Sequence, residues 1–399
     1  MLILSNDYSN NLPNSKHHAK GGPANFAKRF KSFLKIEGHV WLGLIVEFNS
    51  IESPELKFIN KTKSLQYYRL KVPGSLAKKI GRTPNKINAE KLFGPAIDLI
   101  AGLIKETQPD IIFLNGYAIS NWLILKAAQK EKIPVAIQHA GIWTKELRVY
   151  KDFFSLAGRK IMEGMEKEIP KIAAADIFLN DWSRRYFNAH VAKTAKNKTY
   201  IIPLPIDFAF YQKADKKNKK ISKDTFNIGI ISRWDRIKNH ELIAHLAEQA
   251  RKNGLPWKFY SITKIPRTSK NKEIKKLYRK NIKIIPQTNQ VGIRNFCKKM
   301  DLIILPSQFE TAGFVVLESV ASGTPIAISE NVGFVDAFKK YGAQDWVIDF
   351  NNPSSAIKEI IAIANKPMPD KLKNFLFSNH QSDKVFKNYI KLFKNIIKK

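Results

Sequence analysis

The chain has 399 residues, which is enough for two domains of ordinary size. A hydrophobic content of 44% and an aromatic content of 11% exclude a disordered chain, and the single cysteine, Cys297, excludes an internal disulfide framework. Lys and Arg number 68 against 34 Asp and Glu, a net charge of +34. This excess indicates either an anionic partner or a lysine-rich bias of solvated surfaces, and the charge alone leaves both open.

The amino-terminal residues MLILSND are apolar at only four positions and follow no basic region, so no signal peptide is expected. No stretch approaches the roughly 18 apolar residues of a spanning helix. We therefore expect a cytoplasmic protein, either free or peripheral at the inner face of the cytoplasmic membrane. The basic-apolar stretch PGSLAKKIGR (73–82) suits an anionic membrane and ordinary surface equally.

Short apolar, β-branched runs alternate with longer helical patterns through the first half of the chain. The expected strands are residues 2–5, 40–46, 110–115, 134–139, 176–180 and 199–204. Amphipathic stretches such as 24–34 and 94–106 lie between them. Apolar strands alternating with helices are typical of parallel sheets covered on both faces, so this half predicts a doubly wound α/β domain.

The second half repeats this pattern. Its expected strands are residues 226–232, 257–262, 282–286, 301–307 and 324–329. A helix at 240–254 ends in a glycine placed to cap it. Two such series predict two doubly wound domains, each with its ligand edge at the carboxyl ends of its strands.

A charged segment, QKADKKNKKISKD, separates the two series and has almost nothing to bury. We therefore expect an N-terminal domain at 1–208, a linker at 209–224 and a C-terminal domain at 225–380. Residues 381–399 carry an apolar stripe of helical period opposite lysines. We expect this helix to pack back on the N-terminal domain, and a position on an anionic membrane is the alternative.

Two bases follow the first strand of the C-terminal domain. Arg233 and Lys238 lie between that strand's carboxyl end and the amino end of the next helix. Cations at this place can join the helix amides and the helix dipole to hold phosphates. The alternative is two exposed bases in a loop, which such a basic chain offers often.

Two acids lie in the strand–loop–helix segment at 301–323. Glu310 precedes the helix at the sheet's carboxyl edge, Gly313 lets the backbone approach a ligand, and Glu318 lies two turns along the helix. Carboxylates there can accept hydrogen bonds from the hydroxyls of a sugar and a ribose. A capping acid at Glu310 and a surface acid at Glu318 explain the spacing equally well.

Several motifs, in order, resemble the retaining GT-B glycosyltransferases of the group 1, or family 4, type. PSQFETAGFVVLESVASGTPIAISENVG (306–333) resembles their E-x₇-E signature, and Arg233 with Lys238 matches their phosphate pair. IIPLPID (201–207) is similar to their interdomain hinge, and residues 6–30 resemble the glycine-bearing loop after their first strand. The resemblance implies a GT-B architecture, with two doubly wound Rossmann-like domains facing a central cleft.

The resemblance also implies roles for individual residues. Arg233 and Lys238 would hold the donor diphosphate in place of a metal, and Glu310 and Glu318 would accept hydrogen bonds from the donor sugar and the ribose. The amides of Gly313, Phe314 and Val315 would bind the same phosphates, and the loop glycines Gly21 and Gly22 would approach them from the other domain. His139 would lie near the donor sugar. No cofactor and no metal are expected.

The expected function is therefore transfer of a hexosyl or related group from a UDP- or GDP-linked sugar to a glycan, a lipid-linked glycan or a lipid. The transfer would need no metal and would retain the anomeric configuration, as in polysaccharide biosynthesis. Two alternatives stay open. One is a nucleotide-sugar epimerase of the same architecture. The other is a basic protein on a degenerate fold that binds nucleic acid or membrane, although no nucleic-acid partner is expected under the main hypothesis.

Overall fold

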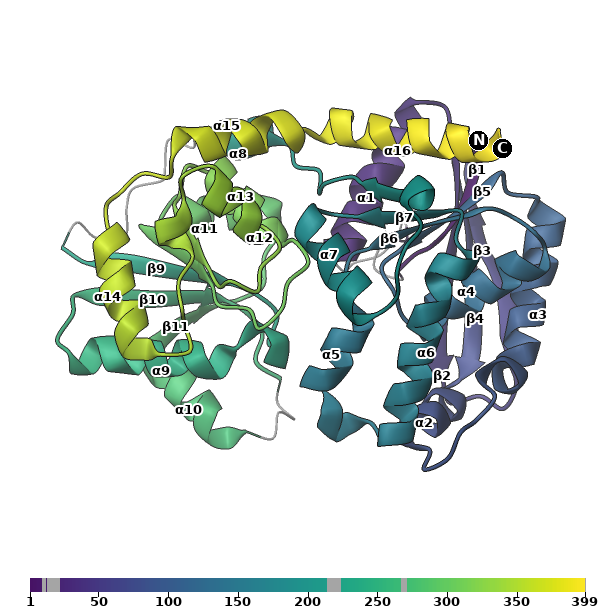
Figure 1. The fold of residues 1–399 in the computed structure, drawn as a ribbon, viewed down its shortest axis with the longest axis horizontal. Coiled ribbons are helices and arrows are strands. Elements are labelled where there is room, and N and C mark those ends of the chain that lie inside the picture. The colour runs from purple at the N-terminus through teal and green to yellow at the C-terminus, as the bar shows by residue number, and fades with distance from the viewer. Residues whose placement is uncertain (9–11, 13–21, 214–223, 267–270, 399) are drawn as a thin grey trace. The chain divides into compact units, whose positions relative to one another are not determined.

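The computed structural model describes residues 1–8, 12, 22–213, 224–266 and 271–398. The chain divides into two compact units. Unit 1 comprises Met1–Leu204 and Asp383–Lys399, and unit 2 comprises Pro205–Ser382. Figure 1 shows both chain ends within unit 1. Each unit has its own sheet, and the prediction of two doubly wound α/β units is confirmed.

Unit 1 contains an eight-stranded sheet in the order β3-β4-β2-β1-β5-β6-β7-β8. The β3–β4 pair is antiparallel and the other pairs are parallel. The strands are β1 (Leu2–Asn6), β2 (Val40–Asn49), β3 (Glu55–Lys61), β4 (Leu65–Pro73), β5 (Ile111–Asn115), β6 (Val135–His139), β7 (Ala175–Phe178) and β8 (Thr199–Ile201).

Helices cover both faces of this sheet, as continuous apolar parallel strands require (Figure 1). They are α1 (Gly22–Ile36), α2 (Gly74–Arg82), α3 (Ala89–Thr107), α4 (Ile119–Lys130), α5 (Trp143–Val149), α6 (Leu156–Ile172), α7 (Asp181–His190) and the carboxyl-terminal α16 (Ser382–Ile397). One apolar core joins β1, β2, β4, β5 and β6 to α2, α3, α4 and α6.

Helix α16 packs on α1 through aromatic side chains. Phe386 stacks on Phe30 with ring centroids 5.2 Å apart, and Tyr389 meets Phe26 edge to face at 5.3 Å. The Tyr389 hydroxyl also donates a hydrogen bond to Gln138 Oε1 of β6 at 2.5 Å. The apolar stripe of the last helix is therefore part of the core of unit 1.

Unit 2 contains a parallel five-stranded sheet in the order β11-β10-β9-β12-β13. Its strands are β9 (Phe226–Ile231), β10 (Trp257–Ile262), β11 (Ile282–Ile285), β12 (Leu302–Leu305) and β13 (Ile326–Ile328). The strand order reverses between β9 and β12, so the loops after these two strands leave the sheet side by side. Open α/β sheets bind their ligands at such a switch point.

The helices of unit 2 are α8 (Phe208–Gln212), α9 (His240–Lys252), α10 (Lys272–Asn281), α11 (Gln290–Cys297), α12 (Phe314–Ala321), α13 (Val335–Lys340), α14 (Pro353–Ile363) and α15 (Asp370–Asn379). Among them, α8 overlaps the linker expected at 209–224. Because Tyr211 is buried in unit 2, the chain passes between the units at 204–205, before the predicted boundary at 208, and again at 382–383. Residues 214–223 of the expected linker lie outside the described residues.

Within the part of the chain that the structure describes, no helix combines the length and the apolarity needed to cross a membrane.

Candidate functional site

The loops after β9 and β12 meet at the carboxyl edge of the unit 2 sheet. The amide of Gln308, after β12, donates a hydrogen bond to the carbonyl of Ile237, after β9, at 2.8 Å. The Lys238 ammonium forms an ion pair with Glu310 Oε2 across the same junction. The topology thus brings together two predicted site residues that lie 72 positions apart in the sequence.

Backbone hydrogen bonds hold both partners of this ion pair. The amide of Glu310 donates to the carbonyl of Asn331 at 3.0 Å, and its carbonyl accepts from Gly333 at 2.8 Å. On the other side, the Asp235 carboxylate accepts from the amide of Ile237 at 3.1 Å and caps the short 3₁₀ turn that carries Lys238. The two side chains are 16% and 19% exposed, so the pair is accessible from solvent but partly desolvated.

Arg233 lies in the same loop but does not share the ion pair. Its side chain is 61% exposed, and its guanidinium lies 3.7 Å from the Asp235 carboxylate. A long, solvent-exposed contact of this kind contributes little to stability, so the guanidinium can turn toward an anion. Arg233 therefore has the accessibility that phosphate binding requires.

His240 holds the backbone of Arg233 and is a residue that sequence reasoning missed. Its Nε2 lies 2.7 Å from the Arg233 carbonyl, which can only accept, so Nε2 carries the proton. The ring stacks on Trp234 with centroids 4.4 Å apart, and Nδ1 lies 3.3 Å from the Tyr278 hydroxyl. Burial lowers the pKa of His240 from 6.5 to about 4, against the opposing effect of the hydrogen bond to Arg233.

This pKa predicts an acid-sensitive contribution to stability. Between pH 6.5 and about 4 the unfolded chain binds a proton at His240 and the folded chain does not, so the free energy of unfolding falls as the pH falls. The loss at the lower pH is about 3 kcal/mol. Urea unfolding of His240→Gln should show a correspondingly weaker pH dependence over this interval.

His245, on the exposed face of the same helix, provides the matched control. His245→Gln should keep the pH dependence of the unmodified protein. If the two variants behave alike, the acid sensitivity arises from other groups.

Gly313, Phe314 and Val315 occupy the amino-terminal end of α12, beside Glu310. Gly313 has φ +100°, and an added Cβ would lie 3.2 Å from Cγ of Glu310 and 3.3 Å from Cδ2 of Leu305. A side chain here would be strained and crowded, so glycine is required where the loop turns into the helix. The three amides thus stand next to the Lys238–Glu310 pair, and their contact with phosphates remains a prediction.

Glu318 is buried, whereas the sequence predicted a position in an open crevice. It is 5% exposed, and its Oε1 accepts a hydrogen bond from the hydroxyl of Tyr211 in α8 at 2.9 Å. Sequence reasoning assigned Tyr211 to the boundary of the linker and missed this contact. Binding of a ribose by Glu318 remains a prediction, and it would require access to a carboxylate that is buried in this structure.

His139 lies at the end of β6 in unit 1, where the sequence placed it, but its ring is fully buried. Nε2 pairs with Asp176 Oδ1 at 2.9 Å, and the ring stacks on Phe178 with centroids 4.4 Å apart. No face of the imidazole is open to a sugar in this arrangement. The structure thus favours the structural alternative for this histidine.

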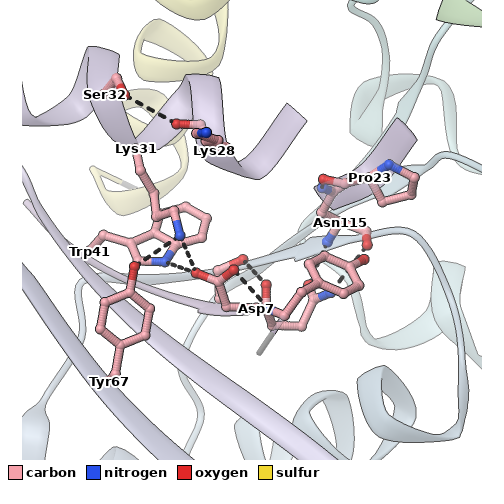
Figure 2. Close-up of polar contacts among 11 residues, drawn as sticks. Asp7, Pro23, Lys28, Lys31, Ser32, Trp41, Tyr67 and Asn115 are labelled. Atoms are coloured by element: carbon pink, nitrogen blue, oxygen red, sulfur yellow. Dashed lines mark hydrogen bonds and ion pairs between the residues drawn. The ribbon is translucent and has the colours of Figure 1, made fainter. Parts of the chain in front are cut away.

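The glycine-bearing loop of unit 1 is only partly described. Gly21 lies outside the described residues, and Gly22 begins α1. Asp7, just after β1, belongs to a buried polar cluster that sequence reasoning missed (Figure 2). Asp7 Oδ2 accepts from Lys31 Nζ at 2.8 Å and from Trp41 Nε1 at 2.9 Å.

Neighbouring amides extend this cluster to the start of α1. Asn115 Nδ2 donates to the carbonyl of Pro23 at 2.7 Å, and its own amide donates to Asn6 Oδ1 at 2.7 Å. The carboxyl ends of β1 and β5 are thereby joined to the first turn of α1, as Figure 2 shows. These contacts fix both described ends of the loop.

Among the described residues, no group of three or more His, Cys, Asp or Glu side chains has the proximity needed to hold a metal ion. The chemical groups that the site of unit 2 does offer are two cations, one accessible carboxylate and helix-end amides. Such a set suits an anionic ligand that also carries hydroxyl groups.

Comparisons with known proteins agree with this picture. Residues 212–377, most of unit 2, match the family model of the group 1 glycosyl transferases. The putative glycosyltransferase EpsF of Bacillus subtilis (strain 168) is 22% identical over 143 residues, which cover 34% of this chain and 37% of EpsF. The match thus spans little more than a third of that relative.

Solved structures resemble the whole chain. Sucrose-phosphate synthase from Thermosynechococcus elongatus matches with a TM-score of 0.74 at 15% identity, covering 99% of this chain and 98% of that one. HepE from Anabaena, solved with UDP and glucose, matches with a TM-score of 0.67 at 13% identity, covering 98% and 99%. At such identities the likeness establishes the fold, which is GT-B.

Proposed function

We propose, from the match of residues 212–377 to the family model of the group 1 glycosyl transferases, that this chain moves a sugar from a nucleotide-diphosphate sugar to an acceptor. The transfer retains the anomeric configuration and uses neither a cofactor nor a metal. The donor is UDP- or GDP-linked and the acceptor is a glycan, a lipid-linked glycan or a lipid. The name of EpsF, a putative glycosyltransferase, and the UDP and glucose bound to HepE support the class of reaction.

The observation that carries the proposal is the Lys238–Glu310 pair at the switch point of unit 2. A cation and an acceptor-only carboxylate in contact can bind the two halves of a nucleotide sugar at once. Lys238 takes the diphosphate, and Glu310 accepts hydrogen bonds from the sugar hydroxyls. Arg233, 61% exposed, supplies the second cation when the donor arrives.

The chemistry follows from where charge develops. The bond from the anomeric carbon to the diphosphate breaks, and negative charge accumulates on the departing phosphate oxygen. Lys238, Arg233 and the amides at the start of α12 stabilise that charge. The acceptor oxygen forms the new bond to the anomeric carbon on the same face, and the departing phosphate takes the proton of the acceptor hydroxyl. Glu310 positions the sugar and stabilises its positive charge without attacking it.

The test compares a nucleoside diphosphate with its nucleoside. Lys238→Met removes the cation and keeps an apolar stem, so the affinity for UDP or GDP should fall about 10- to 100-fold. The affinity for uridine or guanosine should be unchanged, because they carry no phosphate. Isothermal titration of the two ligand types against each variant measures both effects.

Lys280→Met is the matched control, because this exposed lysine of unit 2 lies at the end of α10, away from the carboxyl edge. It should bind the diphosphate like the unmodified protein. If Lys238→Met does the same, Lys238 is not the diphosphate ligand and the proposed function loses its main support. Product analysis with donor alone then separates transfer from epimerisation, which needs no acceptor.

A further inference from the structure

A basic surface with two protruding apolar side chains lies at one end of unit 1. It consists of α2 with the loop that follows it, residues 73–88, and the segment from the end of α5 to the start of α6, residues 148–160. We call it the α2–α6 surface. Figure 1 shows these elements side by side, at the edge where β4 runs into α2.

The apolar side chains are Phe153, 57% exposed, and Leu156, 61% exposed. Exposed apolar side chains that lie close together in the sequence are typical of an interaction surface, and these two lie only three residues apart. Phe154 between them is turned inward, and its Cδ1 lies 3.2 Å from the position that a Cβ on Gly81 would take. The segment is therefore anchored by one aromatic ring while its neighbours point outward.

The surroundings of the two exposed apolar side chains are cationic. The two segments carry eight bases and one acid, Asp152. The bases are Lys78, Lys79, Arg82, Lys86, Arg148, Lys151, Arg159 and Lys160. All are exposed except Arg159, which is partly buried. The excess of bases over acids here is larger than in the chain as a whole, because residues 73–88 contain no acid at all.

The two segments are locked together by backbone contacts. The amide of Ser155 donates to the carbonyl of Gly81 at 2.8 Å, and its hydroxyl donates to the carbonyl of Thr83. Gly158 lies so close that an added Cβ would stand 2.4 Å from the carbonyl oxygen of Ile80. The apolar tips and the bases of α2 are thus held in one fixed arrangement.

We propose that the α2–α6 surface docks this protein on an anionic lipid leaflet, with Phe153 and Leu156 entering the acyl boundary and the surrounding bases contacting lipid headgroups. Apolar insertion combined with several bases is the two-part signal that stable binding to a membrane surface requires. Nucleic acid shares the charge but gives an aliphatic tip such as Leu156 no stacking partner. The inference does not rest on the proposed transfer reaction.

The test is co-sedimentation of the full chain with vesicles of phosphatidylcholine, with and without phosphatidylglycerol. The protein should bind only the anionic vesicles, and more weakly at high salt. Changing Phe153 and Leu156 together to serine should weaken binding at least about tenfold. The triple variant K78Q/K79Q/R82Q should weaken it roughly 100-fold.

The matched control is K258Q/R279Q/K280Q, which removes the same charge from a basic hollow of unit 2 lined also by Trp257 and Lys283. It should bind vesicles nearly as well as the unmodified protein, and thermal unfolding confirms that every variant is folded. An equal loss in both triple variants would show a general charge effect and overturn the proposal. It would be overturned as well if the serine variant kept full vesicle binding while a short RNA competed for the same bases.

Discussion

Glu310→Gln should lower the rate of sugar transfer about 100- to 1,000-fold while leaving the affinity for the nucleoside diphosphate unchanged or slightly higher. The substitution preserves shape but removes the negative charge that accepts hydrogen bonds from the sugar and stabilises its developing positive charge. It also releases Lys238 from its carboxylate partner, so the ammonium is more available to phosphate. Steady-state transfer assays and titration with the diphosphate measure the two quantities separately.

This pattern is opposite to that expected for Lys238→Met, which weakens diphosphate binding. Glu330→Gln is the control, because Glu330 is exposed in the neighbouring loop after β13 and should leave both quantities as they are. A Glu310→Gln protein with full transfer activity would show that the carboxylate serves only to orient Lys238. Because the two side chains are in contact, the effects of the double variant should not be additive.

Lys31→Met should lower the free energy of unfolding of unit 1 by about 3–5 kcal/mol. The Lys31 ammonium lies 2.8 Å from Asp7 Oδ2 and 2.9 Å from the Tyr67 hydroxyl, and the Asp7 side chain is fully buried. Without the ammonium, that carboxylate keeps hydrogen bonds but loses its compensating charge in a region from which water is excluded. Urea unfolding followed by circular dichroism gives the difference.

Lys28→Met is the control for this substitution, since Lys28 is exposed on the same helix. Its cost should stay within about 0.5 kcal/mol. The double variant Lys31→Met with Asp7→Asn should recover part of the loss, because the uncompensated charge is gone. Equal costs for Lys28→Met and Lys31→Met would mean that the buried pair contributes nothing to stability.

Strand runs with continuous apolar character were predictable from the sequence, and so was the alternation of strands and helices that gives both units their parallel strand pairs. The β3–β4 hairpin was missed because ELKFINK and LQYYRLKVP mix polar and apolar residues, as strands with one solvated face do. The boundary was misplaced because a charged stretch marks solvent exposure. It does not mark the point at which the chain leaves one core and enters another.

The site was predictable where topology decides it. Lys238 and Glu310 both follow strands that flank the switch point, so their meeting follows from strand order. The environments of His139 and Glu318 were not predictable, because they depend on side chains from other elements, Asp176 and Tyr211. His240 and the Asp7–Lys31 pair carry no motif, and only their burial gives them a role.

Helix α16 gives the protein a particular order of assembly during synthesis. Unit 2 is continuous in sequence, whereas unit 1 needs residues from both ends of the chain. Phe26, Phe30 and Phe113 precede unit 2 in the sequence, but Phe386, Tyr389 and Phe393, which pack on them, follow it. A ribosome-bound chain can therefore complete unit 2 while the first unit still presents an uncovered aromatic face, which closes only after α16 has left the ribosome. A chain terminated before residue 383 would keep that face exposed to chaperones and proteases.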